Sequence, residues 1–370
     1  AFGYSLYGSD WQTWQVLDLA AQKIISPAFT FKGFGGPGIS WLPNSKSFLY
    51  SSGLSIQEDF RGRRAPQVRL HTLGQKNERV IFENFESPEN TRWAALALSD
   101  TNAIVFRVQG AAVIPAAAFF VDLTTGAATA AIEPNRYLGN VPGHGLVGER
   151  DGKAYLRSAK AGDGFGIYVA GEKAPLIPAE NGNVLYQAQL LGDKILTQYI
   201  SSRLEIEFRL YDLKGKRVAS MRPADFGFTN IGHPSLPLSD GDKTSTAASF
   251  TYSSTGQPPV TFRVDLTKNK FERLPDTGSI NFSDSKLIFE NVRYPSFDGK
   301  MTEMLLVRRS DQKGPAPFAY LYSYGFIGVP NLSQWNRKFQ LALELGGVVA
   351  IPYVRGGGEF GASFQLAGTQ

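Results

Sequence analysis

A short strand that ends in an Asp-Leu-like turn recurs six times in the first three quarters of this 370-residue chain. The copies are WQVLDLAAQK, QVRLHTLGQK, AFFVDLTTGA, GIYVAGEKA, FRLYDLKGKR and TFRVDLTKNK, and they align at Leu19, Leu73, Leu123, Ala170, Leu213 and Leu266. Successive copies therefore lie 43 to 54 residues apart. A repeat of this period constrains the fold more than any single motif, because each copy has to be one supersecondary unit.

The residues of each unit suit strands joined by tight turns. In DLTTG and DLKGK, Asp can bond the backbone of its own turn and Gly accepts a positive φ. FRLYDL and FRVDL alternate apolar and polar residues, as half-buried strands do. A second apolar strand, preceded by a turn such as PNSK or SDTN, lies between the copies. We predict a β-propeller of four-stranded blades, with the first of its six visible repeats incomplete; a large β-sandwich is the alternative.

From about Lys286 the pattern changes. SKLIFENVRYPSFDGKMTEMLLVRR predicts a hairpin that turns at SFDGK, and GPAPFAYLYSYGF predicts a buried strand that ends in a loop. NLSQWNRKFQLALELGG predicts a helix ended by two glycines, with an apolar face of Leu332, Trp335, Phe339, Leu341 and Leu345. VVAIPYV predicts the next strand. This order is how an α/β domain begins, so we predict a propeller domain at 1–283 and a second domain from 284 to 370.

Two glycine-rich stretches lack the setting of a phosphate-binding loop. GFGGPG (33–38) lies between predicted strands, and RGGGEFG is not followed by GK[ST]. We predict that the triple glycine makes a tight strand-exit turn in which side chains would collide. GASFQ (361–365) has Gln where a nucleophile elbow needs Gly, and no complete G-x-S-x-G occurs in the 370 residues.

Composition and spacing exclude several classes of site. The chain has no cysteine, which excludes disulfides, thiolate metal sites and a cysteine nucleophile. No two of His71, His144 and His233 share a short ligand spacing, so we expect loop or surface histidines, no metal site and no cofactor. With a net charge of +5, the basic stretch FRGRR (60–64) predicts a solvated loop rather than a nucleic-acid site. No apolar stretch reaches the length of a membrane span.

Two C-terminal motifs resemble a known family. LYSYGF and the later GGVVAIPYVRGGGEFG are similar to the opening of the peptidase domain of prolyl oligopeptidases, where a YGYGGF loop precedes a strand ending in RGGGEYG. YGSDW, SFTYSSTGQPPVTFRVDL and VRYPSFDGKMTEMLLVRR resemble further segments of that family, so the resemblance covers essentially the whole chain. It implies a β-propeller of the seven-bladed type, with its first blades incomplete, followed by the start of an α/β-hydrolase domain. It also implies a soluble serine peptidase, cytoplasmic or periplasmic and monomeric at full length, that cleaves short proline-containing peptides after proline.

The resemblance carries over few functional residues. Tyr324 matches the second Tyr of YGYGGF, whose hydroxyl donates to the oxyanion, and Phe326 matches the Phe that helps to line the proline pocket. The loop departs from the family, since Ser323 replaces a Gly and one Gly is missing. The family's Ser-Asp-His triad corresponds to sequence beyond Gln370, so we expect a fragment that is inactive alone. The alternatives are an oligopeptidase of the same superfamily that is specific for basic residues, and a non-catalytic propeller binding protein.

Overall fold

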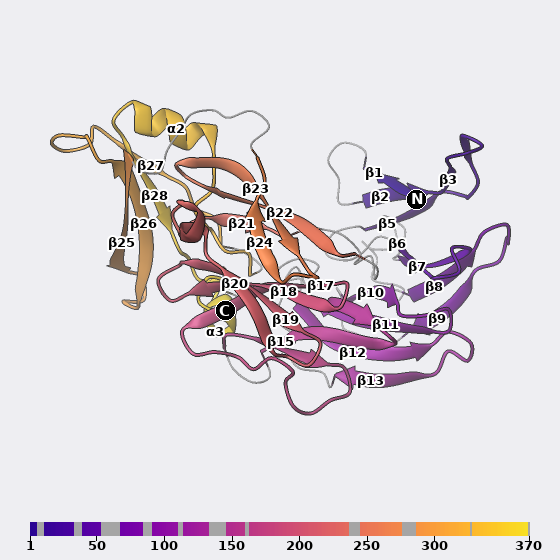
Figure 1. Cartoon of the computed structure of the whole chain (residues 1–370). Coiled ribbons are helices and arrows are strands. Elements are labelled where there is room, and N and C mark those ends of the chain that lie inside the picture. The colour runs from indigo at the N-terminus through magenta and orange to yellow at the C-terminus, as the bar shows by residue number, and fades with distance from the viewer. Residues whose placement is uncertain are drawn as a thin grey trace. The chain divides into compact units, whose positions relative to one another are not determined.

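The structure is a computed structural model, and it describes residues 1–5, 11–32, 39–52, 67–83, 91–109, 114–132, 146–159, 163–236, 245–275, 286–325 and 328–368. The chain divides into two compact units, residues 1–156 with 169–173, and residues 157–168 with 174–370. Strands predominate in both units (Figure 1). The domain boundary expected at 283/284 lies outside the described residues and stays a prediction.

Before residue 276, the described strands form small antiparallel sheets that follow one another along the chain. The first sheet contains β1 (Phe2–Tyr4), β2 (Trp11–Gln15) and β5 (Phe29–Lys32), and β3 (Leu17–Asp18) pairs with β4 (Lys23–Ile24). The second contains β6 (Ile39–Trp41), β7 (Ser47–Ser52), β8 (Gln67–Thr72) and β9 (Arg79–Glu83). The third contains β10 (Thr91–Ala97), β11 (Asn102–Gln109), β12 (Ile114–Asp122) and β13 (Ala128–Ile132).

Three more sheets continue the series. They are β14 (Leu146–Arg150), β15 (Lys153–Ser158) and β16 (Gly166–Val169); then β17 (Asn183–Leu191), β18 (Lys194–Ser201), β19 (Ile206–Asp212) and β20 (Arg217–Met221); then β21 (His233–Ser235), β22 (Ala247–Ser254), β23 (Gln257–Asp265) and β24 (Lys270–Arg273). In all five sheets after the first, the repeated motif coincides with the third strand and the turn after it. One period of the sequence is therefore one sheet, which confirms the predicted propeller blades.

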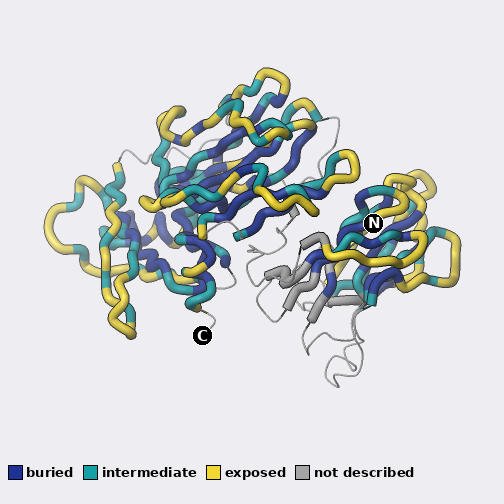
Figure 2. Tube along the Cα trace, turned by 90° about the horizontal axis from the view of Figure 1, so that it is seen from below, coloured by how far each residue is buried: buried dark blue, intermediate teal, exposed yellow. Residues whose placement is uncertain are grey.

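The sheet of β10 to β13 buries apolar residues on both of its faces. On β11, Ala103 and Val105 belong to one buried cluster, which includes residues of β7 to β9. Ile104 and Phe106, on the opposite face of the same strand, belong to a second cluster that includes Leu156 of β15. Since side chains alternate between the faces of a strand, a continuous apolar run is what a sheet covered on both faces requires. Buried residues accordingly follow the strands in Figure 2, and exposed residues gather at the turns.

The predicted role of Asp in the repeated turns is confirmed. Asp122 Oδ1 accepts hydrogen bonds from the backbone N–H groups of Thr124 (2.7 Å) and Thr125 (3.1 Å). Asp265 repeats the pattern with Thr267 N (3.0 Å) and Lys268 N (2.9 Å). The side-chain and backbone bonds that each carboxylate accepts stabilise its charged form, and they lower the pKa of Asp265 to about 2.

After residue 285 a mixed sheet and two helices follow. The sheet order is β25 (Leu287–Pro295), β26 (Met301–Arg309), β28 (Val348–Pro352) and β27 (Ala319–Leu321). The β25–β26 hairpin turns at residues 296–300 as predicted, and β27 pairs with β28 in parallel. Helix α2 (Arg337–Glu344) connects these two parallel strands and packs against them, and α3 (Ala362–Leu366) follows β28. The predicted order of hairpin, strand, helix and strand is confirmed.

The predicted helix is shorter than its apolar pattern, and part of the predicted face is wrong. Its N-cap is Asn336, whose side chain accepts from Lys338 N at 2.9 Å. Phe339 is buried against the rings of Tyr320 and Tyr322 as predicted, but Leu341 is 57% exposed and Leu345 62% exposed. Leu332 is buried from the extended segment before the helix. Leu332 is thus buried as predicted, but not as part of the helix, which begins only at Arg337.

The expectation that the histidines are loop or surface residues is wrong for His71. This residue lies in β8 with 2% of its side chain exposed, and its ring contacts those of Phe29 and Phe48. Burial therefore lowers the pKa of His71. His233 lies in β21 and is half-buried, whereas His144 lies outside the described residues.

Helix α3 receives its N-terminal cap from a distant loop. Asp163 accepts two hydrogen bonds from Ser363, from the backbone N–H to Oδ1 (2.5 Å) and from the hydroxyl to Oδ2 (2.6 Å). The backbone oxygen of Asp163 also accepts from Ala362 N at 3.1 Å. Gly361, the N-cap residue of α3, has no side chain to do this, so Asp163 satisfies the free N–H groups of the first turn instead.

Replacing this cap should loosen α3. We expect Asp163→Ala to destabilise the helix by about 1 kcal/mol, as loss of an N-cap does. The measurement is amide hydrogen exchange of residues 362–366, which should become faster. Asp163→Asn keeps an oxygen acceptor for Ser363 N and is the matched control; equal exchange in the alanine variant and the unmodified chain would contradict the assignment.

Candidate functional site

Two strand-exit segments meet at the carboxyl ends of β27 and β28. Tyr322 N donates to Ala350 O at 2.9 Å, which continues the ladder just past β27, and Gly328 N donates to Gly356 O at 2.8 Å. A β-carbon on Gly356 would lie 2.6 Å from Gly325 O. A β-carbon on Gly358 would lie 2.2 Å from Gly328 O. The triple glycine is therefore the tight turn that was predicted, because no larger residue fits between the two backbones.

Tyr324 lies in the first of these segments. It follows β27 by three residues, and 44% of it is exposed at the carboxyl edge of the parallel strand pair. Ligands of open α/β sheets bind outside the carboxyl ends of the strands, and a tyrosine there can donate a hydrogen bond from its hydroxyl to a bound group. The next residue, Gly325, has a φ of 127°, and a β-carbon there would lie 2.2 Å from Val354 Cγ2. The predicted substrate-binding residue Phe326 lies outside the described residues.

Arg355 holds the same turn against the β25–β26 hairpin. Its guanidinium donates from Nη1 to Asp298 Oδ2 at 2.6 Å and from Nη2 to Ser296 Oγ at 3.2 Å. It also lies over the ring of Phe297, 5.3 Å from the centroid. The bond from Arg355 lowers the pKa of the Asp298 carboxyl, since it stabilises the charged form. The sequence alone did not indicate that Arg355, the first residue of RGGGEFG, would contact the hairpin turn.

A buried carboxylate ends the turn. Glu359 has no exposed surface, and its Oε1 accepts from Asn331 N at 2.5 Å. Burial outweighs this hydrogen bond and raises the pKa of Glu359 to about 7. The hydroxyl of Tyr353 is buried nearby, and the pKa of Tyr353 is raised by burial and by the charge of Glu359. Glu359 therefore changes its charge state near neutral pH.

This carboxylate predicts a pH-dependent stability difference. Between an unfolded pKa of 4.5 and a folded pKa of about 7, the unfolded chain releases a proton that folded Glu359 retains. The contribution of Glu359 is thus fully present below pH 4.5 and is lost as the pH rises through about 7. Gln does not ionise, so Glu359→Gln keeps its stability as the pH rises. The unfolding free energy of Glu359→Gln minus that of the unmodified chain should therefore increase by about 3 kcal/mol between acid and about pH 8. Urea unfolding of both chains across that range measures it; an advantage that does not change with pH would contradict the shift.

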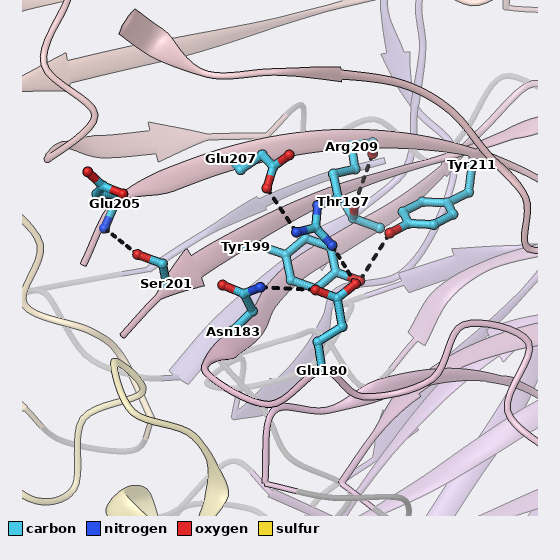
Figure 3. A network of polar contacts seen from close by, with 9 residues as sticks. All are labelled: Glu180, Asn183, Thr197, Tyr199, Ser201, Glu205, Glu207, Arg209 and Tyr211. Carbon is cyan, nitrogen blue, oxygen red and sulfur yellow. Dashed lines mark hydrogen bonds and ion pairs between the residues drawn. The ribbon is translucent and has the colours of Figure 1, made fainter. Parts of the chain in front are cut away.

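A second polar cluster lies in the sheet of β17 to β20 (Figure 3). Arg209, only 4% exposed, donates to Glu180 Oε1 at 2.6 Å and to Glu207 Oε2 at 2.8 Å. Its guanidinium lies 4.1 Å from the centroid of the Tyr199 ring. Burial would raise the pKa of Glu180, but the bonds from Arg209 and Asn183 lower it below its ordinary value. Because charges of both signs are paired here, the cluster resembles a structural ion-pair network more than a catalytic site.

Neither a metal centre nor a membrane span is apparent in the part of the chain that the structure describes. Among those residues, His, Asp and Glu side chains do not form a group of three or more that could hold a metal ion. Over the same residues, no helix has the length and hydropathy needed to cross a bilayer.

The sequence of the chain is similar to known proteins over its whole length. The family model "Prolyl oligopeptidase, N-terminal beta-propeller domain" matches residues 1–277. A prolyl endopeptidase of Elizabethkingia miricola is 23% identical over 396 residues, which cover 100% of this chain and 52% of the relative. The prolyl oligopeptidase ophP of Omphalotus olearius is also 23% identical, over 412 residues, with the same two coverages. The chain thus spans about half the length of these curated relatives.

Solved structures have the same fold as this chain over nearly its whole length. A chain from a structural study of two prolyl endopeptidases superposes with a TM-score of 0.77 at 22% identity, covering 98% of this chain and 52% of that one. Prolyl oligopeptidase B from Galerina marginata, bound to a 25mer macrocyclization substrate, gives a TM-score of 0.77 at 19% identity with the same coverages.

Proposed function

The chain belongs to the prolyl oligopeptidase family, and we propose that it is part of a serine peptidase that cleaves short peptides after proline. In this proposal residues 284–370 begin an α/β-hydrolase domain, and the propeller restricts access to peptide-sized substrates. The Ser, Asp and His of the triad would follow Gln370. The support is the family match, together with two relatives that carry the names prolyl endopeptidase and prolyl oligopeptidase.

The observation that carries the proposal is the position of Tyr324. It extends from the carboxyl end of a parallel strand, on a segment fixed by backbone contact with the glycine turn after the neighbouring strand. In acyl transfer, the serine oxygen would attack the carbonyl carbon while histidine takes the serine proton and later returns it to the leaving amine. The carbonyl oxygen gains negative charge in that step, and the Tyr324 hydroxyl would donate a hydrogen bond to it.

The test begins with the open reading frame beyond Gln370. A serine in a GGSNGG-like segment, followed by Asp and His, is the expected result. The complete protein would then be assayed with two chromogenic peptides that differ only in Pro or Arg before the scissile bond. Faster cleavage after proline supports the proposal, whereas faster cleavage after arginine supports the basic-residue-specific oligopeptidase.

A non-catalytic propeller binding protein is the alternative from another class. It would leave the complete protein without hydrolysis of either peptide and without labelling by a serine-reactive fluorophosphonate. Labelling together with cleavage would exclude it.

A further inference from the structure

Glu359 is fully buried, where a charged group is unfavourable, and only one of its two carboxylate oxygens accepts a hydrogen bond from the described residues. Its Oε1 accepts from Asn331 N, while its Oε2 has no hydrogen-bond partner among the described residues. A buried polar atom without a partner costs free energy, so a carboxylate at this position needs a role beyond filling space. The carboxylate lies directly against the glycine turn, since a β-carbon on Gly357 would be 2.2 Å from Oε2.

The partner of Glu359 joins the two strand ends. Asn331 is 3% exposed, and its side-chain Nδ2 donates to Tyr322 O at 3.3 Å and to Pro352 O at 3.4 Å. Tyr322 is the first residue after β27, and Pro352 is the last residue of β28. Glu359 holds the backbone of Asn331, and the Asn331 side chain in turn holds both strand ends.

Tyr324 follows the anchored carbonyl by two residues. The position of its hydroxyl therefore depends on how firmly Tyr322 is held and on the contact between Gly325 and Gly356. A donor to a developing oxyanion has to be held close to its productive geometry by neighbouring residues that are themselves fixed. A misplacement of about 1 Å can cost about 100-fold in rate.

We propose that Glu359 is a positioning residue that acts through Asn331 to set where the Tyr324 hydroxyl lies. This inference rests on the proposed function for the role of Tyr324, but the hydrogen-bonded link from Glu359 to the strand ends does not. Glu359 touches no reacting atom in this role.

The test compares Glu359→Ala with Glu359→Gln in the complete protein, each with and without Tyr324→Phe. Glu359→Ala removes the acceptor for Asn331 N, and we expect kcat to fall about 10- to 100-fold with little change in KM. Glu359→Gln keeps an oxygen acceptor and should restore most of the rate. In the Tyr324→Phe background, Glu359→Ala should lower kcat much less, because the hydroxyl that it positions is already absent. An equal loss in both backgrounds, or no loss in either, would overturn the proposal.

Hydrogen exchange separates this inference from the proposed function. The amides of Gly328 and Asn331, which donate to Gly356 O and to Glu359, should exchange faster in Glu359→Ala than in Glu359→Gln or the unmodified protein. If the unmodified protein hydrolyses no peptide, the proposed function fails, and this exchange then decides the structural link alone. Unchanged exchange in Glu359→Ala would refute that link whether or not the protein is active.

Discussion

Tyr324→Phe should lower kcat of the complete protein about 100- to 1000-fold and leave KM nearly unchanged. The substitution removes one hydroxyl and keeps the ring, so the segment after β27 keeps its packing. A donor to the oxyanion acts on charge that develops only in the transition state, and its loss therefore appears in kcat rather than in substrate binding. Steady-state kinetics with the proline-containing chromogenic peptide measures both constants.

Tyr320→Phe is the matched control. Tyr320 lies in β27, four residues before Tyr324, and its ring contacts Phe339 of α2 with the centroids 5.8 Å apart. The control therefore loses a hydroxyl close in the sequence that has no proposed catalytic role. Its kcat should stay within about twofold of the unmodified protein, as a substitution away from the reacting groups does. If both variants lost activity equally, or if Tyr324→Phe kept full activity, Tyr324 would not be the oxyanion donor.

The propeller could be predicted because its determinants are local and repeated. At Asp122 and Asp265 the turn carboxylate bonds residues two or three positions further along the chain, so the role of such an Asp is encoded within five residues. The two covered faces of β11 also leave a local signal, the unbroken apolar run from Ala103 to Phe106. The triple glycine was predictable for a related reason, since adjacent glycines after a strand indicate close backbone contact.

The polar contacts that surround the candidate site were not predictable from the sequence alone. Asn331 and Glu359 are 28 residues apart, and Asp163 and Ser363 are 200 residues apart. Nothing in their neighbouring residues marks these pairs, because only the folded chain brings them together. The exposed Leu341 and Leu345 show the same limit, since periodicity indicates a helix but does not say which of its apolar residues are covered.

Arg209→Ala should destabilise the chain by about 3 kcal/mol, because it removes a buried charge that is paired with two carboxylates. Arg209 is buried between Glu180 and Glu207, which are 38% and 17% exposed at their side chains. Removing the cation leaves both carboxylates partly desolvated and without the guanidinium that they bond, and it also removes that guanidinium from the face of Tyr199. Urea unfolding of the 370-residue chain measures the loss.

A matched control and a compensating variant show whether uncompensated charge is the cause. Lys268→Ala breaks an ion pair with Asp265 whose Nζ–Oδ2 distance is 3.6 Å and whose lysine side chain is 77% exposed, so it should cost less than about 1 kcal/mol. Arg209→Met combined with Glu180→Gln and Glu207→Gln should cost less than Arg209→Met alone, because no carboxylate is then left unpaired. If the triple variant were the less stable of the two, packing and hydrogen-bond geometry around Arg209, rather than uncompensated charge, would govern this sheet.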